Sequence, residues 1–286
     1  MNLVILGLGY SSRAFLRAVR PRFRSVVGSV RSVEKAAALS DDGLTVRLFP
    51  GEEDALATDI AGADALLVSV PPGEAGDPVL ARFAADIAAA PRLGWIGYLS
   101  TIGVYGDHHG AWIDEATIPR PLSRRSRWRL AAEEAWLALG RESGKPVHVF
   151  RLAGIYGPGR SAFDKLAAGT ARRLVKPGQV FNRIHVDDIA MVLAASLDRP
   201  RAGAIYNVTD DEPAPPQDVI AYAAELAGRE PPPEAPFDAA ALSPMAASFW
   251  GENKRVRNGL LKAELGVSLA YPSYREGLRA LAPGRA

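Results

Sequence analysis

The sequence of 286 residues contains no cysteine, which excludes disulfide bridges, thiolate nucleophiles and metal centres built on cysteine. Histidine is scarce, with four residues scattered along the chain, so we expect no metal site. No apolar run approaches the ~20 residues that a membrane-spanning helix needs. The chain begins with a short apolar segment, without a basic stretch or cleavage site before it, so we expect a cytoplasmic protein with no membrane partner.

An excess of charge of one sign is also lacking. The 34 basic and 32 acidic residues leave a net charge of +2, which argues against a general nucleic-acid binder. Of the basic residues 28 are arginine and 6 are lysine, a bias that we attribute to genome composition. An arginine-rich stretch is therefore not by itself evidence for a phosphate-binding groove. The hydrophobic content of 48% is typical of a globular protein of one large or two smaller domains.

The first 150 residues alternate short apolar runs with segments of helical periodicity. The runs are continuously apolar, as in parallel strands covered on both faces. The predicted strands are 3–6, 25–29, 45–48, 65–70, 94–100 and 147–151, and the predicted helices are 12–20, 32–39, 77–90 and 124–139. This alternation predicts an α/β fold, a Rossmann-type doubly wound parallel sheet.

Beyond residue 151 the pattern changes, and we expect a small C-terminal substrate lobe. The predicted elements there are helices at 161–173, 187–197, 216–227, 259–265 and 273–281 and a strand at 204–208. We assign residues 1–160 to an NAD(P)-binding Rossmann domain. Residues 161–286 are assigned mainly to substrate-lobe segments, with some elements returning to the sheet.

The first predicted strand leads into a glycine turn and then a helix. Glycine allows the backbone to approach a pyrophosphate closely, and a helix N-terminus supplies N–H donors. Ser12 replaces the third glycine of the strict fingerprint, and a plain strand-to-helix turn is the alternative. The residues of this turn that we expect to contact a dinucleotide are Gly7, Gly9, Tyr10, Ser11 and Ser12.

The residues at the end of the second predicted strand indicate which dinucleotide binds. An NAD site carries an acidic residue here that binds the ribose 2′-hydroxyl, and this chain has none before Glu34. Arg31 is instead placed to pair with a 2′-phosphate, and Ser29 or Ser32 would add a hydroxyl. We therefore predict NADP, with NAD the less favoured cofactor. A solvated arginine at the start of a helix is the alternative interpretation.

The fourth predicted strand ends in Ser69, Val70 and Pro71, at the carboxyl edge where ligands bind in such sheets. These three residues are therefore candidate neighbours of the cofactor. A simple turn at the end of a strand would explain them equally well.

Three segments resemble the extended short-chain dehydrogenases, the NAD(P)-dependent epimerase/dehydratase family. They are Leu-Ser-Thr-Ile-Gly-Val-Tyr-Gly at 99–106, Arg-Leu-Ala-Gly-Ile-Tyr-Gly-Pro-Gly-Arg at 151–160 and Arg-Ile-His-Val-Asp-Asp-Ile-Ala at 183–190. Their order after the glycine turn makes the resemblance specific over about residues 1–210. It implies cofactor contacts at Ala153 and Ile155, and a homodimer is plausible on the same ground.

The resemblance also implies a catalytic Ser/Thr–Tyr–Lys set, which this chain keeps only in part. The Ser/Thr position is Thr101, whereas the tyrosine and lysine positions hold Arg125 and Arg129. Arginine, with a pKa above about 12, does not relay protons. Arg129 would bridge the cofactor ribose or stabilise an anionic oxygen, and the arginines would form a cationic pocket wall. Tyr105 is the best candidate for a substitute proton donor, although such a tyrosine is commonly structural.

Three functions follow from these features. The first is an NADP-binding oxidoreductase or epimerase-like enzyme of the atypical branch that lacks the Tyr-x-x-x-Lys pair, acting on a small, anionic or sugar-like substrate. The second is a non-catalytic dinucleotide-binding sensor or scaffold that has lost the catalytic Tyr and Lys. The third, binding of nucleic acid at 124–129, is disfavoured by the balanced charge.

Overall fold

The computed structural model describes residues 1–40 and 44–282, so the end of the predicted lobe at 283–286 lies outside the described residues. The chain forms two compact units. Unit 1 comprises Met1–Thr101, Arg124–Arg151 and Ile189–Tyr206, and unit 2 comprises Ile102–Ser123, Leu152–Asp188 and Asn207–Ala286. The chain thus passes between the units several times.

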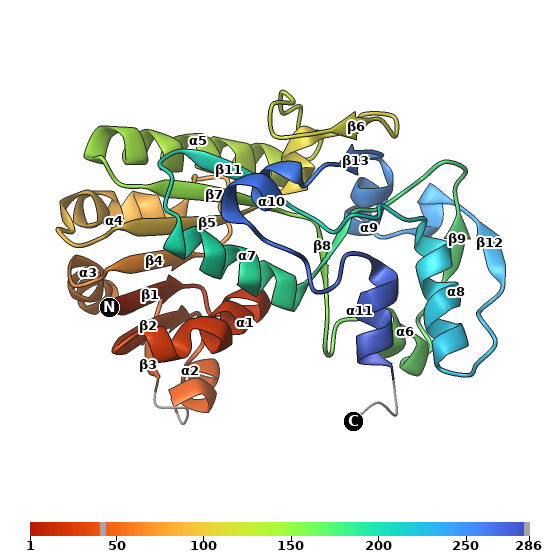
Figure 1. Ribbon diagram of the computed structural model, residues 1–286, viewed down its shortest axis with the longest axis horizontal. Helices are drawn as coiled ribbons and strands as arrows, with labels where there is room; N and C mark the ends of the chain where they lie inside the picture. Colours follow the sequence, from red (N-terminus) through yellow and green to blue (C-terminus); the bar gives the residue numbers. More distant parts are fainter. Residues whose placement is uncertain (41–43, 283–286) are drawn as a thin grey trace. The chain divides into compact units, whose positions relative to one another are not determined.

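Unit 1 is built on a seven-stranded sheet with the order β11-β7-β5-β4-β1-β2-β3 (Figure 1). The strands are β1 Asn2–Leu6, β2 Ser25–Val30, β3 Thr45–Leu48, β4 Ala65–Val68, β5 Trp95–Thr101, β7 Val147–Leu152 and β11 Ala204–Val208. The pairs from β5 to β3 are parallel. The predicted doubly wound α/β fold is confirmed, and its strand order reverses between β1 and β4, where such sheets bind ligands.

Helices cover both faces of this sheet. They are α1 Tyr10–Val19, α2 Val33–Ser40, α3 Glu53–Ala61, α4 Pro78–Ala89, α5 Arg124–Ser143 and α7 Val186–Asp198, and a short 3₁₀ helix η1 spans Arg20–Arg22. The sequence analysis missed α3, although its first turn carries Glu53 and Asp54, which suit a helix N-terminus.

Strand β5 shows how one strand is buried on both sides. Trp95 stacks on Phe15 of α1 at a centroid distance of 5.8 Å and donates to Ser196 of α7 at 2.8 Å. Tyr98, three residues later and on the opposite face, stacks on Trp136 of α5 at 5.8 Å. Because successive side chains alternate, a continuously apolar strand packs against two helix layers at once. Figure 1 shows α1 and α7 on one side of the sheet and α4 and α5 on the other.

Unit 2 contains short strands and helices. They are η2 Ile102–Tyr105, β6 Trp112–Ile113, β8 Gly154–Tyr156, α6 Ala162–Ala167, β9 Arg173–Val175, β10 Arg183–His185, α8 Pro216–Leu226, β12 Glu234–Pro236, η3 Ala239–Ala241, α9 Pro244–Trp250, β13 Arg255–Val256, α10 Gly259–Leu265 and α11 Tyr274–Leu281. The strands pair in twos, as β10-β8, β12-β9 and β13-β6.

The helix predicted at 161–173 is too long. Helix α6 stops at Ala167, and Gly169 follows with φ +66°, in the left-handed region that commonly ends a helix. Residues from Arg173 then form β9. The short strands of unit 2 escape prediction because two or three residues carry too little periodicity to be recognised. No helix among the described residues has the length and apolar character to cross a bilayer.

Candidate active site

The glycine turn lies where strands β1 and β4 end side by side. Gly7 has φ +96°, and an added Cβ would lie 3.1 Å from the backbone nitrogen of Val70. Ser69 donates its backbone N–H to the carbonyl of Leu6 at 2.8 Å. The turn thus requires glycine for both its conformation and its close approach to the neighbouring strand. The two predicted segments, the glycine turn and Ser69–Val70, meet at the carboxyl edge of the sheet.

Helix α1 begins directly after the turn, with Gly9 as its N-cap and no acidic residue in its first turn. The Ser12 hydroxyl is fully buried, and its oxygen has no hydrogen-bond partner among the described residues. A buried hydroxyl that lacks a partner is costly unless a ligand or water satisfies it. The N–H donors of the helix and this hydroxyl together fit the pyrophosphate of a dinucleotide.

Ser29 and Arg31, both predicted at the cofactor, differ in their surroundings. Ser29 is buried and its Oγ accepts from the backbone N–H of Gly7 at 3.0 Å, so its oxygen supports the turn. Arg31 is exposed, directly after β2, and no ion pair or hydrogen bond of its guanidinium is found within the described part of the chain. Ser32 is exposed as well, and its Oγ accepts from the N–H of Lys35 at 3.4 Å.

Helix α5 is joined to the end of β5 by Arg129. The Nη1 atom of Arg129 donates to the carbonyl of Leu99 at 2.8 Å and to the hydroxyl of Tyr98 at 3.1 Å. Thr101, at the last position of β5, is half-buried. Arg125 is exposed and lies one helical turn before Arg129, so the two guanidinium groups share a face of α5. The residue predicted at the lysine position therefore lies beside the strand that ends in Thr101, and the residue predicted at the tyrosine position shares its face of the helix.

Glu133 forms a second connection one turn further along α5. Its carboxylate accepts from Nη2 of Arg151 at 2.7 Å and from the hydroxyl of Ser100. Both Glu133 and Arg151 are buried, with side chains 1% and 4% exposed. The sequence analysis did not identify this pair. Apart from a histidine, Arg151 is the one charged residue of the buried strand β7. A buried charge needs a partner of opposite sign, so the position of Arg151 could have indicated that such a partner exists.

Asp77 connects the loop after β4 to α5. Its Oδ1 accepts from the backbone N–H of Val79 at 2.8 Å, and its Oδ2 accepts from Nε1 of Trp136 at 3.0 Å.

Burial raises the pKa of Tyr98, and the positive charge of Arg129 offsets this rise only in part. The Tyr98 hydroxyl is thus held protonated next to Arg129, and it does not titrate near neutral pH.

Three further predicted site residues, Tyr105, Ala153 and Ile155, belong to unit 2. Tyr105 is fully buried and its hydroxyl donates to Oδ1 of Asn207 at 2.8 Å, an arrangement that suits a structural role. Ala153 donates its backbone N–H to the carbonyl of Val208 at 3.0 Å. Ile155 lies in β8, opposite Ile184 of β10. The predicted roles of these residues and of Pro71, which is exposed, stay predictions.

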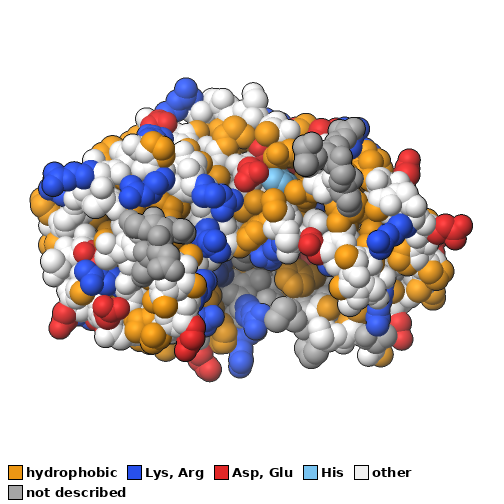
Figure 2. All heavy atoms as spheres, turned by 90° about the horizontal axis from the view of Figure 1, so that it is seen from below, with side chains coloured by type: hydrophobic (Ala, Val, Ile, Leu, Met, Phe, Trp, Pro, Cys, Tyr) orange, Lys and Arg blue, Asp and Glu red, His pale blue; other side chains and the backbone are white. Residues whose placement is uncertain are grey.

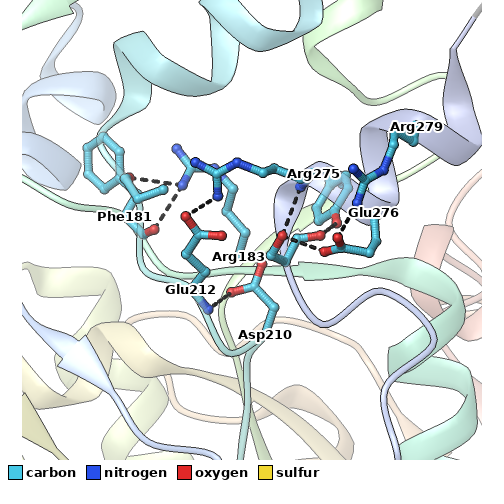
Figure 3. A network of polar contacts seen from close by, with 10 residues as sticks. Phe181, Arg183, Asp210, Glu212, Arg275, Glu276 and Arg279 are labelled. Atoms are coloured by element: carbon cyan, nitrogen blue, oxygen red, sulfur yellow. Dashed lines mark hydrogen bonds and ion pairs between the residues drawn. The ribbon is translucent and has the colours of Figure 1, made fainter.

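The segment at 183–190 is part of a polar network in unit 2 (Figure 3). Nη1 of Arg183 donates to the carbonyls of Phe181 and Ala214 at 2.9 and 3.0 Å, and Arg275 forms an ion pair with Glu212. Asp210 is buried, and desolvation raises the pKa of its carboxyl group despite the nearby Arg183. The guanidinium group of Arg183 therefore binds backbone carbonyl oxygens within unit 2.

Charged side chains of both signs are interspersed on the face drawn in Figure 2. This distribution agrees with the small net charge of +2.

Comparison with known proteins identifies relatives over most of the chain. A family model described as "NAD dependent epimerase/dehydratase family" matches residues 87–209. Protein YeeZ of Escherichia coli K12 is 31% identical over 245 residues, which cover 81% of this chain and 85% of YeeZ. A Streptomyces protein named 3-diazoavenalumate denitrifying reductase is 31% identical over 144 residues, 46% of this chain and 45% of that protein.

Solved structures resemble the fold over nearly the whole chain. A conserved protein of unknown function from Silicibacter pomeroyi is 54% identical with a TM-score of 0.90, covering 98% of both chains. The human epimerase family protein SDR39U1, solved with NADPH, is 18% identical with a TM-score of 0.74, covering 99% of this chain and 100% of that one. At such low identity the second likeness concerns the fold alone.

Proposed function

Because the chain belongs to the NAD dependent epimerase/dehydratase family, we propose that it is an NADP(H)-dependent oxidoreductase acting on a small, anionic or sugar-like substrate. The family relationship supports a nicotinamide dinucleotide as cofactor. Gly7, the N-terminus of α1 and the buried hydroxyl of Ser12 would hold its pyrophosphate. Once bound, the cofactor supplies the hydride chemistry, and the protein positions and polarises the substrate.

The preference for NADP over NAD rests on one observation, the exposed guanidinium of Arg31 directly after β2. No acidic residue stands at the end of this strand to accept from a ribose 2′-hydroxyl. A guanidinium group pairs with a phosphate through two charge-assisted hydrogen bonds and gains nothing comparable from a hydroxyl. NADH is expected to bind more weakly for this reason.

Calorimetric titration with NADPH and NADH tests this preference. We expect Arg31→Ala to weaken NADPH binding about tenfold or more and to leave NADH binding almost unchanged. Arg24→Ala is the matched control, because Arg24 is exposed at the opposite end of the same strand, about 20 Å away. Equal affinity for the two nucleotides would overturn the preference for NADP, and binding of neither would overturn the function itself.

The two arginines of α5 favour a second candidate function, a dinucleotide-binding sensor or scaffold without turnover. In this version Arg129 serves to hold β5 through Leu99, and no residue performs proton transfer. One measurement distinguishes the two candidate functions. Transfer of deuterium from labelled NADPH to any acceptor supports the enzyme, and its absence across ketones, quinones and nucleotide sugars supports the sensor.

The homodimer and the cytoplasmic location expected from the sequence belong to the same proposal. Sedimentation of the purified protein would give the oligomeric state directly.

A further inference from the structure

The geometry of α5 points to a substrate whose reacting oxygen is a stable anion in the product, as in the reduction of a quinone to a hydroquinone. We infer that Arg125 and Arg129 together bind this oxygen as a phenolate-type anion. The inference rests on the proposed function for the hydride donor, but the binding of the anion itself does not require the cofactor.

The two guanidinium groups differ in a way that suits this role. Arg129 is fixed, because both hydrogens of Nη1 are used on Leu99 and Tyr98. Its Nη2 and Nε atoms form no hydrogen bond with other described residues. Arg125, one turn earlier on the same face, has no partner among the described residues either. One oriented cation and one adaptable cation therefore present unused N–H donors along the same face of the helix.

These donors lie at the edge of the sheet where the proposed cofactor would bind. Arg129 contacts the end of β5, and β5 pairs with β4, whose neighbour β1 ends in the glycine turn. Ligands of doubly wound sheets bind along this carboxyl edge. The pair of arginines and the dinucleotide turn thus belong to one edge of unit 1.

The hydroxyl groups of Tyr98 and Ser100, which flank Leu99 in β5, are unsuited to donate a proton at neutral pH. Ser100 donates to Glu133, which is also paired with Arg151. Tyr98 is buried beside Arg129, and arginine itself does not deprotonate. An ordinary ketone gives a strongly basic alkoxide on reduction and needs such a donor, whereas a hydroquinone monoanion is a weak base that a guanidinium group stabilises.

The reaction balances without a proton from the protein. NADPH loses a hydride to become NADP⁺, and the quinone accepts that hydride to become the hydroquinone monoanion. Water then supplies the proton that completes the hydroquinone.

Binding of 4-nitrophenol to the cofactor-free protein tests the anion site, because absorbance distinguishes the phenol from the phenolate. We expect the bound form to be the phenolate, with the pKa of the phenol lowered by about one unit. Arg125→Gln and Arg129→Gln should each weaken binding about tenfold. Arg141→Gln, an exposed arginine in the last turn of the same helix about 24 Å from Arg125, should leave it unchanged.

Reduction of 1,4-naphthoquinone and of 1-tetralone by NADPH, without oxygen, supplies the second test. We expect reduction of the quinone at a rate that varies little between about pH 6 and 9, and no reduction of the ketone. The double variant Arg125→Tyr/Arg129→Lys restores the family's pair, and should gain ketone reduction.

The outcomes separate this inference from the proposed function. Failure to bind phenolate, or reduction of tetralone by the natural chain, overturns the inference while NADPH binding still supports the proposed function. Absence of NADPH binding overturns the proposed function even where phenolate binds.

Discussion

Nη1 of Arg129 lies 2.8 Å from the carbonyl oxygen of Leu99, so the residue predicted at the family's lysine position supports the strand that carries Thr101. A lysine ammonium group is a point donor, whereas the planar guanidinium of arginine bonds to the protein on one edge and keeps further donors for a ligand. This contact is compatible with the predicted binding role of Arg129, because Nη1 holds the strand while the other nitrogens of the guanidinium group remain available.

The buried pair Glu133–Arg151 is expected to contribute strongly to stability. Glu133→Gln removes the carboxylate charge that faces the buried Arg151 and should lower the free energy of unfolding by about 3–5 kcal/mol, as measured by urea denaturation. Glu134→Gln is the matched control, because Glu134 is exposed on the same helix. Equal effects of the two substitutions would show that the pair is not structurally important.

The hydroxyl of Ser12 should matter to the cofactor and little to the fold. Ser12→Ala removes a buried oxygen that has no partner in the described part of the chain, so the melting temperature should stay the same or rise slightly. NADPH affinity should fall about three- to tenfold, because the pyrophosphate loses one hydrogen bond. Unchanged affinity in a calorimetric titration would remove Ser12 from the proposed cofactor site.

The contact between Trp136 and Asp77 should stabilise the loop after β4. Trp136→Phe keeps an aromatic ring beside Tyr98 but deletes the 3.0 Å hydrogen bond to Asp77. We expect a loss of about 1–3 kcal/mol in thermal or urea unfolding. Trp128→Phe, at a half-buried position on the same helix, serves as the comparison and should cost less. Equal losses of unfolding free energy in the two variants would contradict this prediction.

His148 should make the protein less stable in acid. Burial lowers the pKa of His148 from 6.5 to about 4, and its Nε2 accepts from the backbone N–H of Arg201 at 2.7 Å. A histidine with a lower pKa in the folded state binds fewer protons when folded than when unfolded. Its contribution of about 3 kcal/mol is therefore complete above about pH 6.5 and is lost as the pH falls toward about 4.

Urea denaturation at several pH values measures this effect of His148. His148→Gln keeps an acceptor for Arg201 without a titrating ring and should flatten the pH dependence of the free energy of unfolding over this range. A natural protein whose stability does not change between these pH values would contradict the prediction.

Much of unit 1 can be predicted because its strands and helices carry local patterns. The apolar runs at β1 and β4 and the periodicity of α4 lie within single short segments, and the Gly7 turn follows its strand directly. The strands of unit 2, such as β8 and β10, have three residues each and are held by pairing with distant segments. Helix α6 is shorter than predicted because Gly169 interrupts it.

The sequence by itself determined the doubly wound fold, the position of the glycine turn and the absence of a Tyr-x-x-x-Lys pattern, because these depend on neighbouring residues. Only the tertiary structure decided what the candidate side chains contact. Ser29 supports Gly7 from 22 residues away, Arg129 holds Leu99 from 30 residues away, and Tyr105 binds Asn207 from 102 residues away. Hydrogen-bond partners at such separations are set by how strands and helices pack, and no local pattern encodes them.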